Sequence, residues 1–319
     1  MSVLVTGGSG YIGSHIVRQL RDRGDAPVVV DDFVTGRRER IPGIPYREVD
    51  LASPGAEHVL TELIAEHGVA AIIHLAARKQ AGASVERPLE YYRDNTRGLS
   101  SVLTAARAAG VRDVVFSSSA AVYGDAMADV DESAPVAPAN PYGRTKLMGE
   151  WMTAAAARAH GLRAVSLRYF NVAGAQWPDL ADTARLNLIP MILGRVRDGR
   201  PPQIFGDDYD TPDGTCVRDF IHVADVADAH LAVLDALPRQ REPHRVFNVG
   251  TGVGTSVRQI VDGVRSRLHA DAEPLVMGRR PGDPPRVVAS VDRIHHELGW
   301  RAKYSLDDIL DSACGLVVS

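Results

Sequence analysis

The chain has 319 residues, of which 45% are hydrophobic and 24% are charged, as in an ordinary globular protein. Its formal net charge of −4 gives no basic field for binding nucleic acid or an anionic membrane. The two cysteines, Cys216 and Cys314, lie far apart and lack metal-ligand spacing, which favours a reducing compartment and excludes a disulfide framework. The N-terminus has no secretory pattern and no apolar run reaches bilayer length, so we expect a cytoplasmic protein.

Short apolar strands alternate with amphipathic helices through the first half of the chain. The pattern predicts strands at 2–6, 27–31, 70–75, 113–119 and 163–170. It predicts helices at 12–24, near 88–109 and at 142–160. Continuous apolar strands separated by helices are typical of a parallel sheet that is covered on both faces. The sequence therefore predicts an α/β fold with a Rossmann-type, doubly wound parallel sheet.

A glycine-rich turn follows the first strand. The run from Gly8 to Gly13 fits G-x-G-x-x-G, and Gly7, Gly10 and Gly13 also fit G-x-x-G-x-x-G. Glycines let the backbone approach a pyrophosphate, and the N-terminus of the following helix supplies N–H groups and positive potential. Asp31 follows about 20 residues later at the end of the second strand, where a carboxylate takes ribose hydroxyls. This context predicts a dinucleotide site.

The charges around the second strand bear on which dinucleotide binds. Asp31 and Asp32 favour NAD, because a 2′-phosphate would meet like charge, whereas Arg37 and Arg38 argue in the other direction. Asp50, in V-D-L after another strand, is placed to reach the adenine, and an exposed N-cap is the alternative role for it.

The composition and the hydrophobic pattern of the sequence change after about residue 172. Pro and Gly clusters appear, such as P-P-Q-I-F-G-D and R-R-P-G-D-P-P, and hydrophobic periodicity weakens. We interpret residues 1–171 as the NAD-binding domain and 172–319 as mainly a smaller substrate-binding lobe. Segments near 220–250, which include I-H-V-A-D-V-A-D-A-H-L and V-F-N-V-G, are expected to return to the main sheet. The two lobes should therefore interleave.

Tyr142 and Lys146 lie four residues apart at the start of an expected helix, so their side chains would share one face. Only three of the 36 lysines and arginines are lysines, namely Lys79, Lys146 and Lys303, so a chance pair at this spacing is rare. An ammonium can change its pKa and donate as a point charge, which guanidinium cannot do. The pair indicates an acid–base device, with an ordinary helix start as the alternative.

Seven segments carry a resemblance to a known family. They are V-L-V-T-G-G-S-G-Y-I-G-S-H, P-L-E-Y-Y-R-D-N, F-S-S-S-A-A-V-Y-G-D, P-Y-G-R-T-K-L-M-G-E, L-R-Y-F-N-V-A-G-A, G-T-C-V-R-D-F-I-H-V-A-D and R-R-P-G-D. Over essentially its whole length the chain resembles the extended short-chain dehydrogenase/reductases, and within them the UDP-galactose 4-epimerases. The resemblance implies a Ser/Tyr/Lys active site, tightly held NAD, and a homodimer through a four-helix bundle built by the helices near 88–109 and 142–160.

The resemblance also implies roles for single residues. Tyr142 would be the acid/base, and Lys146 together with the positive nicotinamide should lower the pKa of its phenol. Lys146 would also hold the nicotinamide ribose, and Ser119 would hydrogen-bond the reacting sugar hydroxyl. Further cofactor contacts would come from Tyr11, Ile12, Leu51, Lys79, Asn95 and Tyr169. The UDP-sugar would be bound by Arg218 and Arg280 at the diphosphate, by Asn187, Phe205 and Asp283 at the uridine and its ribose, and by Asn171 at the sugar.

The implied reaction is epimerisation at C4′ of a UDP-hexose through a 4-keto intermediate. A nucleotide-sugar 4,6-dehydratase is one alternative, but it would need an acid and a base after Ser119, where this chain has Ala120 and Ala121. A non-catalytic NAD-binding module is another, and it would not require the Ser/Tyr/Lys set. Tyr142→Phe separates the last alternative from an enzyme.

The preferred sugar stays open at the level of the sequence. Val287 stands where many relatives carry a bulkier residue, so an N-acetylated sugar could be accommodated. Arg78 and Arg185 could instead suit the carboxylate of a UDP-hexuronate. A further departure is Val172-Ala173 after Asn171, where the family usually has Pro-Val.

Overall fold

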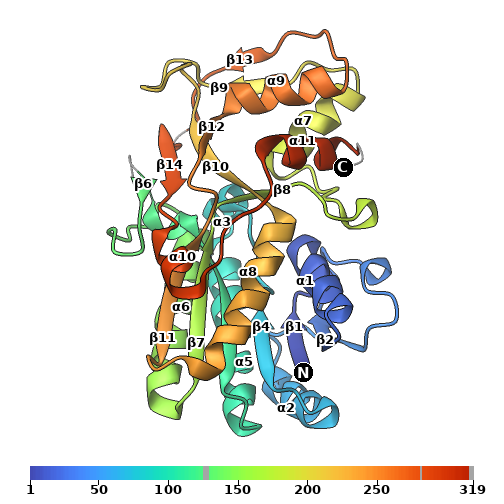
Figure 1. Cartoon of the computed structure of the whole chain (residues 1–319), viewed down its shortest axis with the longest axis vertical. Coiled ribbons are helices and arrows are strands. Elements are labelled where there is room, and N and C mark those ends of the chain that lie inside the picture. The colour runs from blue at the N-terminus through green and yellow to red at the C-terminus, as the bar shows by residue number, and fades with distance from the viewer. Residues whose placement is uncertain (125–128, 281, 316–319) are drawn as a thin grey trace.

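The central sheet of the computed structural model, which describes residues 1–124, 129–280 and 282–315, has seven parallel strands (Figure 1). Its strands are β1 (Ser2–Thr6), β2 (Ala26–Asp31), β3 (Tyr46–Glu48), β4 (Ala71–His74), β5 (Asp113–Ser119), β7 (Arg163–Tyr169) and β11 (His244–Val249). They lie in the order β11-β7-β5-β4-β1-β2-β3, with every pair of neighbours parallel. Asp125 and Pro281, which belong to two of the motifs quoted above, lie outside the described residues.

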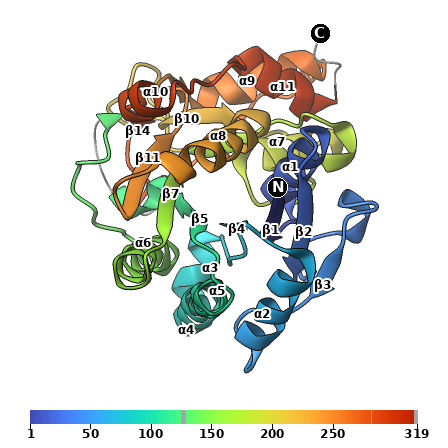
Figure 2. The same ribbon diagram turned by 60° about the horizontal axis from the view of Figure 1, so that its bottom comes forward.

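Helices cover both faces of this sheet, as Figure 2 shows. One face packs against α1 (Tyr11–Asp22) and α8 (Val223–Ala236), and the other against α2 (Ala56–His67), α5 (Gly98–Ala108) and α6 (Pro141–His160). Side chains alternate between the faces along a strand, so Val3 and Val5 join the first core whereas Leu4 joins the second. The continuous apolar run of β1 is thereby explained, and the predicted doubly wound fold is confirmed.

A second sheet is built mostly from the later part of the chain. It contains β12 (Gly254–Ser256), β10 (Val217–His222), β14 (Arg286–Ala289), β6 (Asp129–Val130) and β8 (Asn171–Ala173). Beside it, β9 (Gln203–Phe205) pairs with β13 (Leu275–Met277), and one apolar cluster joins α7 (Leu188–Arg197), α9 (Val257–Arg267) and α11 (Leu306–Cys314). These elements form the upper part of Figure 1.

The segment near 220–250 divides between the two sheets. β11, with the sequence H-R-V-F-N-V, pairs with β7 at the edge of the main sheet. By contrast β10, whose last residues are I-H, pairs with β8, β12 and β14 in the second sheet. The helix α8 between them lies on the main sheet beside α1. The chain therefore passes back to the main sheet after entering the second one.

The region expected as one helix near 88–109 consists of three segments. These are α4 (Pro88–Tyr92), a π turn at Arg93–Arg97, and α5. Two further short helices are α3 (Ala81–Glu86) and α10 (Asp292–Leu298). Within the described ranges, no helix is both long enough and apolar enough to cross a membrane. Cys216 and Cys314 are buried and not joined to each other.

Candidate active site

The glycine turn after β1 brings backbone close to backbone. Gly7 has a φ of +72°, and a Cβ there would lie 2.8 Å from the backbone nitrogen of Ala76. A Cβ at Gly13 would overlap the carbonyl oxygen of Gly7. Gly10 precedes α1 and offers no side-chain cap, so the first N–H groups of the helix keep no partner within it. The turn therefore leaves the N–H groups at the start of α1 available to an anion.

Asp31 is held at the end of β2 with its carboxylate facing this turn. Its side chain is almost fully buried, and its two oxygens accept hydrogen bonds from the backbone nitrogens of Ser9 and Phe33, each at 3.0 Å. A carboxylate has lone pairs beyond these two, so Asp31 can still accept ribose hydroxyls. Burial raises the pKa of neighbouring Asp32, and the negative charges of Asp31 and Asp50 raise it further. This acidic setting suits a free 2′-hydroxyl rather than a phosphate.

Tyr142 and Lys146 lie one turn apart at the start of α6. Asn140 caps this helix by accepting a hydrogen bond from the backbone nitrogen of Gly143 at 2.9 Å, and Pro141 occupies the first helical position. Lys146 is buried, and its Nζ donates to the carbonyl oxygen of Ser117 at 2.6 Å. The same Nζ lies 5.9 Å from the centroid of the Tyr142 ring. The helix therefore holds the phenol and the ammonium together at the end of β5.

The protein's own groups set the protonation of this pair. Burial raises the pKa of Tyr142, and a hydrogen bond with the Ser119 hydroxyl opposes that rise. Burial lowers the pKa of Lys146 to about 7, against the attraction of Glu150. The expected lowering of the Tyr142 pKa is thus not met by the protein's own groups, because removing the phenol from water outweighs the favourable contacts.

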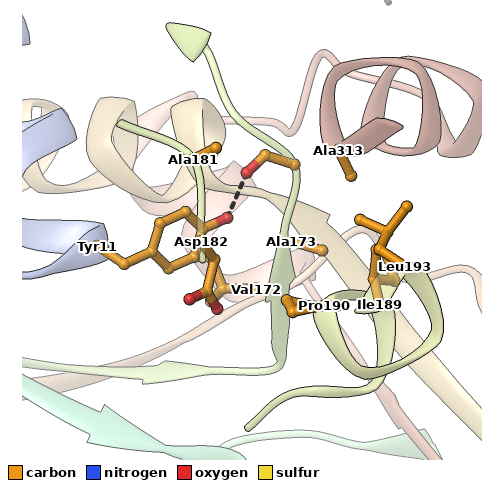
Figure 3. Close-up of a pocket in the computed structure, with 10 residues that line it drawn as sticks. Tyr11, Val172, Ala173, Ala181, Asp182, Ile189, Pro190, Leu193 and Ala313 are labelled. Atoms are coloured by element: carbon orange, nitrogen blue, oxygen red, sulfur yellow. Dashed lines mark hydrogen bonds between the residues drawn. The ribbon is translucent and has the colours of Figure 1, made fainter. Parts of the chain in front are cut away.

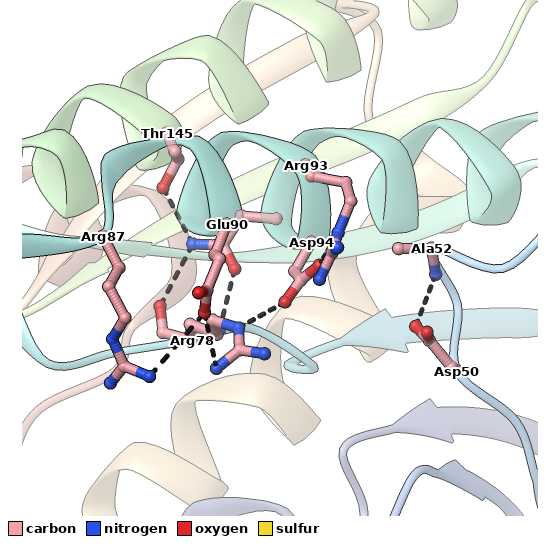
Figure 4. A network of polar contacts seen from close by, with 9 residues as sticks. Asp50, Ala52, Arg78, Arg87, Glu90, Arg93, Asp94 and Thr145 are labelled. Atoms are coloured by element: carbon pink, nitrogen blue, oxygen red, sulfur yellow. Dashed lines mark hydrogen bonds and ion pairs between the residues drawn. The ribbon is translucent and has the colours of Figure 1, made fainter. Parts of the chain in front are cut away.

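Asn95 joins two parts of the site across the π turn. Its Nδ2 donates to the carbonyl oxygen of Arg78 at 3.0 Å and to Oγ1 of Thr145 at 2.9 Å, and its Oδ1 accepts from the backbone nitrogen of Arg78 at 2.8 Å (Figure 4). Thr145 in turn donates to the carbonyl oxygen of Tyr142 at 2.8 Å. Both amide hydrogens of Asn95 are used, so this residue fixes the segment after β4 against α6. Lys79, next in that segment, is exposed.

The remaining cofactor candidates lie in different surroundings. Asp50 is exposed and accepts a hydrogen bond from the backbone nitrogen of Ala52 at 2.9 Å, whereas Leu51 is buried in the core. The hydroxyl of Tyr169 faces Nε2 of His230. His230 Nδ1 lies 2.8 Å from the carbonyl oxygen of Val226, which can only accept, so Nδ1 carries the hydrogen and Nε2 accepts from Tyr169.

The second sheet brings several predicted substrate residues together. Arg218 on β10 is the register partner of Val287 on β14, and its guanidinium lies 3.4 Å from the carboxylate of Asp283. Val287 is buried in one apolar cluster with Val122, Leu147 and Phe170, which lie around the strand end of Ser119 and the start of α6. The guanidinium of Arg280 lies 3.9 Å above the ring of Phe205. Val287 thus connects β14, beside Arg218, to the strand end of Ser119 and the start of α6.

Asn171 and Asn187 come from the neighbouring segments. Asn171 is exposed at the start of β8, opposite Phe220 of β10. Asn187 precedes α7 and donates to the carboxylate of Asp182 at 2.7 Å.

A small cavity lies between α1, the segment after β8 and α7. Its lining includes Tyr11, Val172 and Asp182, and the hydroxyl of Tyr11 donates to the carbonyl oxygen of Gly174 at 2.5 Å (Figure 3). The catalytic candidates are not part of its lining. The cavity therefore lies where the helix after the glycine turn meets the segment that begins with Asn171.

Both arginines considered for a hexuronate carboxylate are paired with carboxylates of the protein. Arg78 pairs with Asp94 and lies 3.7 Å from Glu90 (Figure 4). Arg185 makes a two-pronged pair with Asp198, at 2.6 and 3.1 Å. Each guanidinium is thus already engaged by a carboxylate of the protein, which it shares with Arg93 or Arg200.

Sequence reasoning missed Glu150 and Arg168, which form a buried ion pair behind Lys146. The signal was present, since Glu150 follows Lys146 by four residues and so continues the same helix face.

A doubly wound sheet with a glycine turn and a carboxylate at the end of its second strand defines a dinucleotide-binding protein of the Rossmann type. Residues 3–250 match the model of the NAD dependent epimerase/dehydratase family, and the chain belongs to that family. It is 46% identical over 318 residues to a UDP-glucose 4-epimerase of Azospirillum brasilense, covering 98% of this chain and 90% of the relative.

Two solved structures resemble the whole chain. The UDP-glucose 4-epimerase of Brucella ovis in complex with NAD has a TM-score of 0.92 and 39% identity, and covers 98% of this chain and 97% of its own. The UDP-glucose-4-epimerase of Stenotrophomonas maltophila, with bound NAD and formylated UDP-arabinopyranose, has a TM-score of 0.92 and 36% identity, and covers 99% and 97%. The resemblance inferred from the seven sequence segments is thereby confirmed.

Proposed function

We propose that the protein is an isomerase that catalyses NAD-dependent 4-epimerisation of a UDP-hexose of the UDP-glucose/UDP-galactose type. The observation that carries this proposal is the pair of Tyr142 and buried Lys146 beside Ser119, in a family whose relatives are UDP-glucose 4-epimerases. Bound NAD would supply the acceptor for a hydride from C4′ of the sugar and the donor for its return. No net oxidation results from the cycle.

The residues around the phenol divide the remaining work. Tyr142 accepts the proton of the O4′ hydroxyl and returns it after the 4-keto sugar has turned its other face, while Ser119 hydrogen-bonds that oxygen. Because burial raises the pKa of Tyr142 in the protein alone, the lowering needed for a base is assigned mainly to the positive charge of the bound nicotinamide, to which a protonated Lys146 would add. Lys146 also holds the nicotinamide ribose.

The cofactor site follows from the glycine turn and Asp31. We assign the pyrophosphate to the turn of Gly7, Gly10 and Gly13 with the first residues of α1, Tyr11 and Ile12. The adenosine is assigned to Asp31, Asp50 and Leu51, and the nicotinamide end to Lys79, Asn95 and Tyr169. Asn95 acts there through the segment that it holds, because its amide hydrogens are already donated.

The UDP-sugar site is assigned to the region between the two sheets. Arg218 and Arg280 would bind the diphosphate, and Phe205, Asn187 and Asp283 would place the uridine and its ribose. Asn171 and Val287 would border the sugar. This assignment divides the chain into an NAD-binding part, 1–171, and a mainly substrate-binding part, 172–319.

Two alternatives lose support from the structure. A 4,6-dehydratase would need proton-transferring side chains after Ser119, and the 3₁₀ turn Ala120–Tyr123 begins there with two alanines. A hexuronate 4-epimerase would need free cations near the sugar, and Arg78 and Arg185 are paired with Asp94 and Asp198. The N-acetylated sugar stays a second candidate, because Val287 is small.

Exposed apolar side chains on neighbouring helices support a homodimer through a four-helix bundle. Leu89 on α4 is 80% exposed and Trp151 on α6 is 61% exposed, and the two helices lie against each other. Such side chains gather where a partner covers them. The two unpaired cysteines fit a reducing compartment, and we place the enzyme in the cytoplasm.

The test is to incubate the purified protein separately with UDP-galactose, UDP-N-acetylgalactosamine and UDP-glucuronate, adding no NAD. Chromatography should show conversion of UDP-galactose to its C4 epimer, driven by cofactor that stays bound during purification. Absence of all three C4 epimers from cofactor-loaded protein would refute the proposal.

A further inference from the structure

A row of buried polar side chains crosses the main sheet directly behind the strand end that carries Ser119. Ser118 on β5, Arg168 on β7 and Asn248 on β11 are register partners on neighbouring strands. All three are buried, and Asn248 is fully so. Partners in register present their side chains to the same face of a sheet, so the three residues form one polar line among apolar strands.

Glu150 on α6 lies over this row and joins its members. Its carboxylate accepts two hydrogen bonds from Arg168, at 2.9 and 2.8 Å, and one from the hydroxyl of Ser118 at 2.5 Å. Arg168 also donates to the hydroxyl of Tyr123 at 2.8 Å, and Tyr123 donates to Oδ1 of Asn248 at 2.7 Å. The side chains of Glu150 and Arg168 are 5% and 6% exposed. The row is therefore a connected network with a charged pair at its centre.

The stability of the fold does not by itself explain a buried ion pair between Glu150 and Arg168. Two charges lose their hydration on burial, and replacing a buried ion pair by well-packed apolar residues is often neutral or stabilising. The location gives a stronger reason. Glu150 follows Lys146 by one helical turn, and Lys146 donates to the carbonyl oxygen of Ser117 while Glu150 accepts from Ser118. The two side chains thus hold adjacent residues of the strand that ends at Ser119.

We propose that Glu150, held by Arg168 and Ser118, is a positioning residue of the reaction: it fixes α6 on the strand end of Ser119 and balances the charge behind Lys146. The inference rests on the proposed function for the identity of the reaction. Glu150 acts through Lys146 and Ser118 and does not itself touch the reacting atoms.

The surroundings of Lys146 make the charge balance testable. Buried titratable groups on the elements against this part of α6 are His74 on β4, Tyr91 on α4, Tyr123 after β5, and Arg168 and Tyr169 on β7, and His244 on β11 is half-buried. Burial lowers the pKa of His74 to about 3 and of His244 to about 4, so both are neutral at pH 7. Asp94, on the π turn, pairs with Arg78 and Arg93. Glu132 adds a negative charge at the far end of the row, where it accepts a hydrogen bond from the backbone nitrogen of Asn248 at 2.7 Å. The buried charged pair behind Lys146 is that of Glu150 and Arg168.

Removing one charge of the pair leaves the other uncompensated, so the two single variants should shift the pKa values of Lys146 and Tyr142 in opposite directions. In Glu150→Gln the unpaired Arg168 disfavours added positive charge, so Lys146 and Tyr142 should both lose their protons at lower pH. In Arg168→Gln the unpaired Glu150 should move both titrations to higher pH. A shift on the order of one pH unit in each direction is expected at this spacing.

The shift in the pKa of Lys146 can be measured by NMR titration of the lysines, which does not require the enzyme to be active. The chain has three lysines, so protein labelled with ¹³C at the lysine ε-carbon gives three signals, and Lys79→Arg and Lys303→Arg identify the other two. The Lys146 midpoint should move down in Glu150→Gln and up in Arg168→Gln. The matched control is Asp113→Asn, which breaks a similar pair with Arg163 at the opposite end of β5 and β7 and should leave the midpoint unchanged.

The pH profile of kcat gives a second readout, and its limbs should move in the same two directions. Midpoints that move together, or do not move, would overturn the inference even if the rates fall, because a purely structural role predicts a loss of rate without opposite shifts. If one single variant fails to fold, the other decides: its Lys146 midpoint must move in the direction given above, and an unchanged midpoint refutes the inference. The double variant, Glu150→Gln with Arg168→Gln, is a further control, and a displaced Lys146 midpoint there would also refute charge balance. An inactive wild type would refute the proposed function and leave the lysine titration readable.

Discussion

Tyr142 is half-buried and has two specific neighbours, Ser119 and Lys146. We expect Tyr142→Phe to lower kcat by roughly 10²–10⁴-fold, because a positioned acid/base contributes about that much. Bound NAD and binding of UDP should be retained, since the ring and the helix stay in place. Rates would be followed by product chromatography, and nucleotide content by absorbance after denaturation. A variant with the wild-type rate would favour the non-catalytic NAD-binding module instead.

Val287 is buried among Val122, Leu147 and Phe170, beside the strand end of Ser119. A larger side chain at this position should reduce the space next to the sugar. We therefore expect Val287→Tyr to suppress activity on UDP-N-acetylgalactosamine more than on UDP-galactose, measured as the ratio of the two kcat/KM values. Equal losses on both substrates would remove Val287 from the account of specificity.

At the scale of single residues, the sequence predicted which residues lie together better than it predicted their burial, pKa values and hydrogen bonds. Tyr142 and Lys146 were predictable because a four-residue spacing on a helix brings side chains together whatever the rest of the chain does. The raised pKa of Tyr142 was not predictable, because it depends on how completely the surrounding elements exclude water. The sequence also could not show that both amide hydrogens of Asn95 are already donated within the protein, because its partner Thr145 comes from a different helix.

Helix α6 packs unusually close to β5, and Gly149 permits this contact. A Cβ at Gly149 would overlap the ring of Phe116 on β5. We expect Gly149→Ala to destabilise the protein by about 1–3 kcal/mol, because extra volume in a packed core forces its neighbours to move. The same displacement should lower kcat, since α6 carries Tyr142 and Lys146.

Urea unfolding and rate measurements on this variant provide the check. Gly82→Ala in α3 is the matched control for stability, because no atom lies within 4 Å of the added Cβ. It should leave the free energy of unfolding unchanged or slightly raised. An unchanged unfolding midpoint in Gly149→Ala would show that Phe116 can move without cost.

At the scale of elements, prediction succeeded where strands are long and apolar. β1, β5 and β7 were predicted within a residue of their ends, because buried parallel strands read as continuous apolar runs. The later strands β8, β9, β12 and β13 have three residues each, too few to show a period. The π turn at Arg93–Arg97 was also missed, because its sequence differs little from that of an ordinary helix.

Four fully buried histidines make the stability of the whole molecule depend on pH. Burial lowers the pKa of His15, His222 and His230 to about 4 and that of His74 to about 3. An unfolded histidine titrates near 6.5, so the unfolded state binds more protons below that pH and the folded state loses stability. Each histidine contributes a loss of about 1.4 kcal/mol per pH unit between about pH 6.5 and its folded pKa. Asp225, whose pKa burial raises to about 6, opposes them, as do Asp32 and Asp219, whose pKa values burial also raises.

We therefore expect the urea midpoint to be highest above pH 6.5 and to fall steadily towards pH 4. His222→Gln should make this dependence shallower. His58→Gln is the control, because the side chain of His58 is 78% exposed and should not contribute. A midpoint that does not change between pH 7 and pH 5 would contradict the assignment of neutral buried histidines.

The dimer proposal belongs to the same scale. A charge at Trp151, on the exposed face of α6, should oppose burial against a second copy, so Trp151→Glu should shift the mass measured by light scattering from dimer to monomer. Val253→Glu, at another residue with 63% exposure, is the control and should leave the mass unchanged. A wild-type mass equal to that of one chain would contradict the proposal.

The return of the chain to the main sheet through α8 and β11 has a consequence for dissecting the protein. A fragment that stops at residue 171 would retain β7 but lack β11 beside it, and the face beside α1 would lose the apolar side chains of α8. A complementary fragment would carry those elements with no sheet to cover. Neither half could close its own core, so exchanging the second half alone between relatives would exchange part of the nucleotide-binding scaffold as well.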